Sequence, residues 1–254
     1  MLELPPINHC ARSGSSCNGF DSPPIIVINM KRKHSTTNDN VHKQKLQKQA
    51  IVFHEAGHAA AIYLNNKAHN LPPIYFQIIL NDSRFFIDEN GTCFQATHDQ
   101  CTSRVEGGRL IEEFVLNIAD LSLDLMIKEG TVSTSTAAYL SAFDADIINL
   151  LVGPLAEAKF SYSRDDELFT HKMVNLAALK NYGGEADLDL VHEYIESFSS
   201  SHSLQEAKMA ELFKQACEFV TNASHWQAIT KLANYILLGN KNVISCEEIE
   251  AVLV

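Results

Sequence analysis

The amino-acid sequence predicts a mainly α domain with one small antiparallel β-sheet, preceded by a polar tail. With 46% hydrophobic and 20% charged residues among 254, the composition is that of a globular protein and excludes a wholly disordered or fibrous chain. Apolar residues repeat with the helical period of 3.6 over most of the chain after residue 104. Ile74–Leu80 is instead rich in aromatic and β-branched residues, as strands are. We therefore expect a tail over residues 1–38 and a folded domain over residues 39–254.

The expected tail is polar and basic. Residues 1–38 are rich in Pro, Ser, Asn and Gly, with Phe20 as their one aromatic residue, so burial of apolar surface cannot offset the loss of chain entropy. The basic run Lys31–His34 is interpreted as solvated tail, with contact to nucleic acid or an anionic surface, or an address signal, as alternatives. Residues 49–254 hold 13 Lys and Arg against 28 Asp and Glu, which argues against nucleic-acid binding by the folded part.

Neither a membrane span nor a secretory leader is expected. The longest apolar stretches, such as Ile147–Ala158, are shorter than the roughly 18–20 residues that cross a bilayer. The first residues lack a basic region followed by an apolar run. The six cysteines include no C-x-x-C pair, which argues against a thiolate zinc site. The sequence therefore predicts a cytoplasmic protein with reduced thiols.

The elements follow from local signals. Asn38–Asn40 supplies N-cap oxygens for a helix over about residues 41–64. Strands are expected over 74–80, 84–87 and 92–97, joined by turns at Asn81–Ser83 and Asp88–Gly91, in one antiparallel sheet. The helical period then predicts helices over about 110–130, 142–160, 165–181 and 186–198, the third stopped by Gly183 and Gly184. Three later helices are expected to open at Ser203, Ser224 and Ser245.

The motif H-E-x-x-H lies within the first predicted helix. His54 and His58 lie one turn apart and project from the same face, as two nitrogen ligands of one Zn²⁺ require. Glu55 lies about 100° further round the helix, where its carboxylate can take a proton from a zinc-activated water and return it to the leaving amine. We expect one zinc ion per chain, with His54 and His58 as ligands and Glu55 as the general base.

The third protein ligand is distant in sequence. The extension H-E-x-x-H-x-x-G-x-x-H is absent, because Ala61 and Leu64 stand at its last two defined positions. A catalytic zinc needs a third ligand and an open fourth position. Spacing alone leaves several acidic or histidine candidates on later helices: Asp144, Asp146, Glu157, Asp187, Asp189, His192 and Glu193.

Four blocks resemble the FtsH family, the membrane-bound AAA proteases, whose zinc motif reads H-E-A-G-H-A. The first block is Phe53–Ala59, and the others follow in the family's order: Leu151–Glu157, similar to G-G-R-A-A-E-E, Gly183–Leu188, similar to T-G-A-x-N-D-L, and the closing segment Leu232–Ile249. The resemblance covers about residues 46–254. It implies an FtsH-like helical peptidase domain in which Asp187 is the third zinc ligand.

The chain also departs from the family's pattern. His58 and Asp187 are 129 residues apart, so extra segments are expected over about 98–135 and 160–180. Pro154 replaces the Arg of the second block, and Ala158 its last Glu. No G-x-x-x-x-G-K-[ST] motif is present, so no ATP binding of the AAA type is expected.

The predicted function is that of a zinc-dependent, ATP-independent endopeptidase acting on unfolded or flexible polypeptides. An extended substrate can pair with a sheet edge, which the strand over 74–80 or over 92–97 is expected to supply unless these strands are only structural. A partner protein that presents substrates fits the lack of an unfoldase. The alternatives are a non-catalytic, zinc-stabilised interaction module derived from a peptidase, and a zinc hydrolase of a non-peptide substrate.

Overall fold

The computed structural model describes residues 36–80, 85–87, 93–95, 103–113, 134–165, 167, 169–170 and 174–254. The helices in these ranges are α1 (Thr36–Ala68), α2 (Leu110–Glu113), α4 (Thr134–Arg164), the 3-10 helix η2 (Leu176–Tyr182), α5 (Glu185–Phe198), α6 (His202–Thr221), α7 (Ala223–Leu238) and α8 (Cys246–Leu253). The strands are β1 (Phe76–Ile79), β2 (Phe85–Ile87), β3 (Cys93–Gln95), β4 (Arg104–Gly107) and β5 (Val243–Ile244). A mainly α fold with a small antiparallel sheet is therefore confirmed. The predicted tail lies outside the described residues, except for the start of α1.

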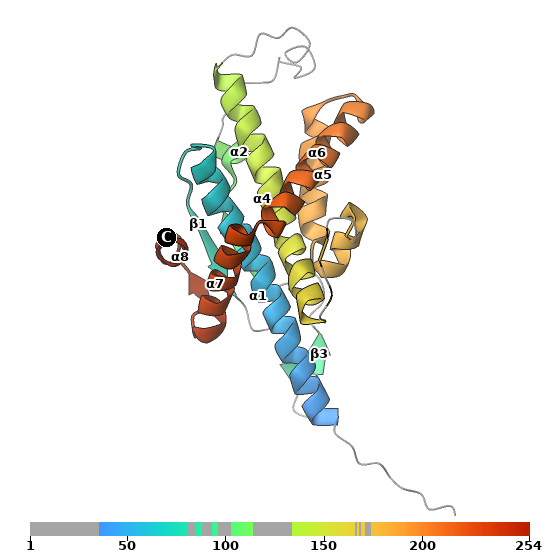
Figure 1. The fold of residues 1–254 in the computed structure, drawn as a ribbon, viewed down its shortest axis with the longest axis vertical. Coiled ribbons are helices and arrows are strands. Elements are labelled where there is room, and N and C mark those ends of the chain that lie inside the picture. Colours follow the sequence, from blue (N-terminus) through green and yellow to red (C-terminus); the bar gives the residue numbers. More distant parts are fainter. Residues whose placement is uncertain are drawn as a thin grey trace, which may run out of the picture.

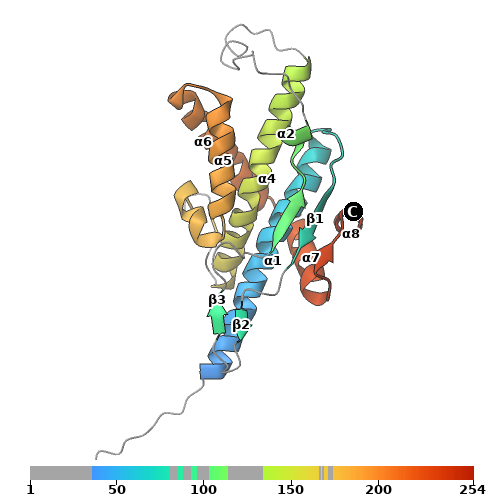
Figure 2. The ribbon, with the colours of Figure 1, turned by 180° about the vertical axis from the view of Figure 1, so that it is seen from behind.

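Two long helices, α1 and α4, form the centre of the fold. Figures 1 and 2 show them side by side, with α5 and α6 beyond α4 and with β1, α7 and α8 beyond α1. Their shared face is built from small side chains, since Ala56, Ala59 and Ala60 are fully buried. A Cβ on Gly57 would lie 2.7 Å from the Cβ of Ala156, so glycine is needed for the close approach of the two backbones.

Helix α4 belongs to the core and is longer than the predicted 142–160. Its stretch Ala137–Arg164 is long and apolar enough to cross a membrane by length and composition alone, but 67% of the 18-residue apolar window within it is buried inside the structure. Burial of that extent is what a core helix requires. Pro154 lies inside α4, where it packs near Gly184: a Cβ on that glycine would approach the proline ring to 2.7 Å.

The sheet differs from the predicted one. β1 is the central strand of the order β4-β1-β5, with antiparallel partners on both sides. Among the residues that the structure describes, β2 and β3 pair with each other in a separate two-stranded sheet. The prediction of one sheet over 74–97, followed only by helices, was therefore wrong. The partners of β1 come from strands of four and two residues far along the chain, too short to leave a period-two pattern in the sequence.

The later helices correct several predicted boundaries. Instead of a helix over 165–181, η2 begins only at Leu176, where the Asn175 side chain accepts from the backbone N–H of Ala178. Ser203 lies inside α6 and does not cap it. Asn222, rather than Ser224, caps α7 by accepting from two backbone N–H groups. Of the three serines, only Ser245 forms the predicted capping box.

Of two other predicted helices, the structure describes one in part and confirms the other. Of the helix expected over 110–130, the structure describes only the turn α2, and the remainder lies outside the described residues. The helix predicted over 186–198 is confirmed as α5. α5 carries the candidate ligand Asp187 in its first turn, so this boundary matters for the site.

Candidate metal centre

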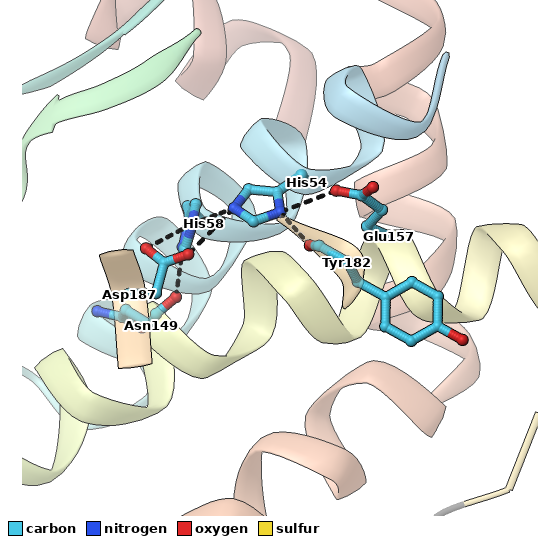
Figure 3. A network of polar contacts seen from close by, with 6 residues as sticks. All are labelled: His54, His58, Asn149, Glu157, Tyr182 and Asp187. Atoms are coloured by element: carbon cyan, nitrogen blue, oxygen red, sulfur yellow. Dashed lines mark hydrogen bonds and ion pairs between the residues drawn. The ribbon is translucent and has the colours of Figure 1, made fainter. Parts of the chain in front are cut away.

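Helix α1 places the two histidines of the motif on one buried face. His54 and His58 are each 7% exposed, and their Nε2 atoms lie 3.0 Å apart. Figure 3 shows both imidazole rings turned toward Asp187. The i, i+4 spacing thus produces the expected convergence of two ring nitrogens.

Asp187 reaches the same point from the first turn of α5. Its Oδ2 lies 3.2 Å from Nε2 of His54, and its Oδ1 lies 3.4 Å from Nε2 of His58. Gly183 turns the chain into α5 with a φ of 73°, a left-handed conformation that glycine adopts without strain. The structure therefore brings together His54, His58 and Asp187, whose ligand atoms all lie within 4.8 Å of one another.

The geometry of these atoms fits a metal ion. Zinc bonds of 2.0–2.1 Å in a tetrahedron imply about 3.3 Å between neighbouring ligand atoms. The two Nε2 atoms lie 3.0 Å apart, and each faces a different oxygen of Asp187, at 3.2 Å for His54 and 3.4 Å for His58. Both histidines use Nδ1 toward oxygen acceptors, so in the neutral rings both Nε2 atoms carry lone pairs. Two lone pairs and a carboxylate at this separation repel one another unless a cation lies between them. The cluster can thus hold a metal ion.

Hydrogen bonds from the surrounding elements fix the orientation of both rings. His58 donates through Nδ1 to the backbone carbonyl of Asn149, at 2.8 Å. Nδ1 of His54 lies 3.1 Å from the backbone carbonyl of Tyr182 and 3.1 Å from Oε2 of Glu157 (Figure 3). Such outer partners set the tautomer and raise the basicity of a ligating histidine. Glu157, one of the possible third ligands, therefore lies behind His54 rather than beside Asp187.

Gly153 on α4 makes room for the rings. A Cβ at this position would lie 2.2 Å from Nε2 of His58, closer than any Cβ contact tolerates. The sequence alone marked Gly153 only as part of a block resembling the FtsH family. The physical reason for the glycine is the direct contact between the α4 backbone and a candidate ligand.

A cavity of about 560 Å³ opens at the three residues. Glu55, 4% exposed, lines it together with His54, His58 and Asp187. β4 forms another wall through Arg104, Val105 and Gly107, and α4 contributes Asn149 and Leu150. Glu55 therefore lies at the cavity without belonging to the ligand cluster.

The other predicted third ligands lie elsewhere. Asp144 pairs with Lys208 at 2.8 Å. Asp146 accepts from the backbone N–H groups of Leu110 and Ile111 at the start of α2. The remaining candidates are exposed on α5 and are absent from the cluster: Asp189, His192 and Glu193.

The charges and hydrogen bonds within the cluster shift the pKa values of His54 and Asp187 in opposite directions. Burial alone would lower the pKa of His54, but hydrogen bonds to Asp187 and Glu157 and the charges of Asp187 and Glu55 raise it well above its ordinary value. Burial would raise the pKa of Asp187, but the charge of His58 and hydrogen bonds to both histidines hold it far below its usual range. Without a metal, a proton on His54 therefore takes the place of the cation.

We expect zinc to stabilise the protein more at about pH 8 than at about pH 6. A raised folded pKa means that the stabilisation from protonated His54 is complete below its unfolded pKa and is lost as pH rises through the folded pKa. Zinc must displace that proton, so its affinity rises over the same range. Thermal denaturation with and without zinc at both pH values measures the effect. Equal zinc-induced shifts in Tm would contradict it.

Comparisons of the chain with protein-family models, with curated proteins and with solved structures found no match. The resemblance to the FtsH family therefore remains an inference from four sequence blocks. What the structure adds is independent of that family: residues 129 positions apart in the sequence meet in one buried metal-binding geometry.

Proposed function

We propose that the protein is a zinc-dependent, ATP-independent endopeptidase that hydrolyses unfolded or flexible polypeptides. The observation that carries this proposal is the position of Glu55, buried at the cavity into which His54, His58 and Asp187 converge. A zinc site with three protein ligands and an adjacent carboxylate is a hydrolytic arrangement, because structural zinc sites usually have four protein ligands and no open position.

The proposed chemistry divides between the ion and the chain. When bound, zinc supplies a Lewis acid that polarises a carbonyl and lowers the pKa of water. His54, His58 and Asp187 hold the ion, while Asn149, Tyr182 and Glu157 fix the two imidazoles. Glu55 accepts the proton of the attacking water through its carboxylate and donates it to the nitrogen that leaves when the C–N bond breaks.

The edge of the sheet offers a place for an extended substrate. β1 is paired on both sides and cannot accept another strand, so the expectation that residues 74–80 supply the edge was wrong. Residues 93–95 pair with β2 in a separate two-stranded sheet. β4 pairs with β1 on one side only within the described part of the chain, and it forms a cavity wall. Strand addition to β4 would lay a peptide along the cavity.

A second hollow of about 460 Å³ extends the cavity along α1. It shares Gln47, Glu157 and Asn181 with the first and is bounded at its far end by Lys43 and Arg164. Together the two hollows follow α1 from Lys43 to Ile62, a distance of about 28 Å at 1.5 Å per residue. That length accommodates about eight extended residues with the histidines between the ends, which favours cleavage within a chain.

The test is cleavage of β-casein, a flexible protein, by the zinc-loaded chain without ATP. We expect fragments to appear, to disappear when zinc is removed with phenanthroline and to return when zinc is restored. Folded lysozyme, as the control substrate, should resist. A protein that binds one zinc but cleaves neither casein nor a library of short peptides would support the non-catalytic interaction module instead.

A further inference from the structure

A buried carboxylate on α4 holds the start of α2. Asp146 is 1% exposed. Its Oδ1 accepts from the backbone N–H of Leu110 at 3.1 Å, and its Oδ2 accepts from the backbone N–H of Ile111 at 2.8 Å. The first N–H groups of a helix have no acceptor within that helix, so Asp146 supplies both acceptors from another element. Figure 2 shows the short α2 beside α4, where this contact docks it.

The same contact anchors one end of the edge strand β4. Only Gly108 and Arg109 separate β4 from α2. Gly107 and Gly108 both have a φ of 80°, and because glycine adopts many conformations readily, this joint does not fix the direction of the chain by itself. On one side the anchor is β1, which pairs with β4 up to Gly107 and is preceded by Tyr75, whose carbonyl accepts from the N–H of Gly108. On the other side the anchor is Asp146.

Helix α4 therefore contacts both the metal centre and the segment that ends the edge strand. Asn149 accepts from Nδ1 of His58 through its backbone carbonyl, at 2.8 Å. Asp146 lies three residues earlier, about one helical turn away. The separation between His58 and β4 across the cavity thus depends on hydrogen bonds that one helix makes to both. A peptide paired with β4 keeps its distance from the metal ligands only while these bonds are intact.

We propose that Asp146 is a positioning residue for the substrate, because it holds the edge strand β4 at the cavity through the start of α2. This inference rests on the proposed peptidase function and on strand addition to β4. Asp146 acts without touching the substrate, since it is buried and both its oxygens accept hydrogen bonds from the chain. Its replacement should weaken substrate binding and leave zinc binding and the chemical step unaltered.

The test is steady-state cleavage of β-casein by the zinc-loaded full chain, with acetohydroxamate as an inhibitor that binds the metal alone. Asp146→Asn keeps the side-chain volume but places an N–H group against a backbone N–H. A β4 strand that is in position about a tenth of the time binds an added strand about tenfold more weakly. We therefore expect KM for casein to rise about tenfold, with kcat, zinc content and inhibition by acetohydroxamate within about twofold of the wild type.

A second variant tests the same contact from its other side. Ile111→Pro removes the N–H that donates to Oδ2 of Asp146, and proline is tolerated in the first turn of a helix. It should also raise KM and leave the zinc content unchanged. Asp144→Asn is the matched control. It makes the same chemical change two residues earlier on α4, where the carboxylate pairs with Lys208, and should alter neither KM nor kcat.

Each outcome decides the inference. An unchanged KM in Asp146→Asn and Ile111→Pro would overturn the role of Asp146, while casein cleavage by the wild type would leave the peptidase function standing. Loss of zinc, or a fall in kcat without a change in KM, would also overturn it, since the damage would then reach the metal centre. The same rise in KM in Asp144→Asn would show a general effect of charge loss on α4 and overturn it too. If Asp146→Asn does not fold, Ile111→Pro decides alone. A wild type that binds zinc but cleaves neither casein nor short peptides would contradict both proposals.

Discussion

The Glu55→Gln variant is expected to keep its zinc and its fold while losing peptide hydrolysis by a factor of about 10²–10⁴. Glutamine has nearly the shape of glutamate, so the buried position on α1 should tolerate it. The amide cannot take a proton from water at neutral pH, and Glu55 does not belong to the ligand cluster. Initial rates on casein, together with zinc content and Tm, measure the effect.

The matched control for this variant is Glu196→Gln, an exposed glutamate on α5. It makes the same chemical change away from the cavity and should leave the rate unaltered. Undiminished cleavage by Glu55→Gln would mean that another group is the base or that a contaminating protease produces the activity. Loss of both zinc and activity would instead assign Glu55 to metal binding.

Removal of the Asp187 carboxylate is expected to weaken zinc binding more than about 100-fold. Loss of an outer partner already costs about 10–100-fold in metal affinity, and Asp187 contacts both Nε2 atoms directly. Asp187→Ala and Asp187→Asn should both show the loss, the second with little change in side-chain volume. Competition with a fluorescent zinc chelator at about pH 8 measures the affinity.

Asp189→Ala provides the control on the same helix. Asp189 is exposed and lies outside the cluster, so its replacement should alter zinc affinity little. Activity should disappear with Asp187→Ala and persist with Asp189→Ala. Equal zinc affinity in the wild type and Asp187→Ala would show that this carboxylate is not a ligand.

The part of the site that depends on local spacing could be predicted from the sequence. His54 and His58 share a helix, and one turn of that helix sets their separation, so the pattern alone indicated a pair of ligands. Asp187 was harder to predict as a ligand, because a contact between residues 129 positions apart leaves no periodic signal in the sequence. The seven candidates were equivalent by spacing, and only the resemblance to the FtsH family favoured Asp187 among them.

The partners of the site residues could not be predicted for a physical reason. The rings of His54 and His58 are oriented by the backbone carbonyls of Tyr182 and Asn149, and every residue carries such a carbonyl. The wall formed by β4 depends on its pairing with β1, which joins segments nearly thirty residues apart, as in the pair Gln77 and Glu106. Neither feature has a sequence signature of its own.

The positions of some helices could also be predicted from local signals in the sequence. The 3.6-residue apolar period and the boundary residues predicted where α5 and α8 begin. These boundaries were predictable because the turn at Gly183 and the cap at Ser245 act on neighbouring residues in the sequence. Ser203 and Ser224 failed as caps, since each has a competing residue close before it, Ser201 or Asn222, at the actual helix start.

The most direct test of the metal centre is a crystal structure of the zinc-soaked protein, with anomalous data collected on both sides of the zinc absorption edge. We expect one anomalous peak at this site in each chain, within about 2.0–2.2 Å of Nε2 of His54, Nε2 of His58 and a carboxylate oxygen of Asp187. A peak bound by Asp189, Glu157 or His192 in place of Asp187, or the absence of a peak between the two histidines, would contradict this assignment.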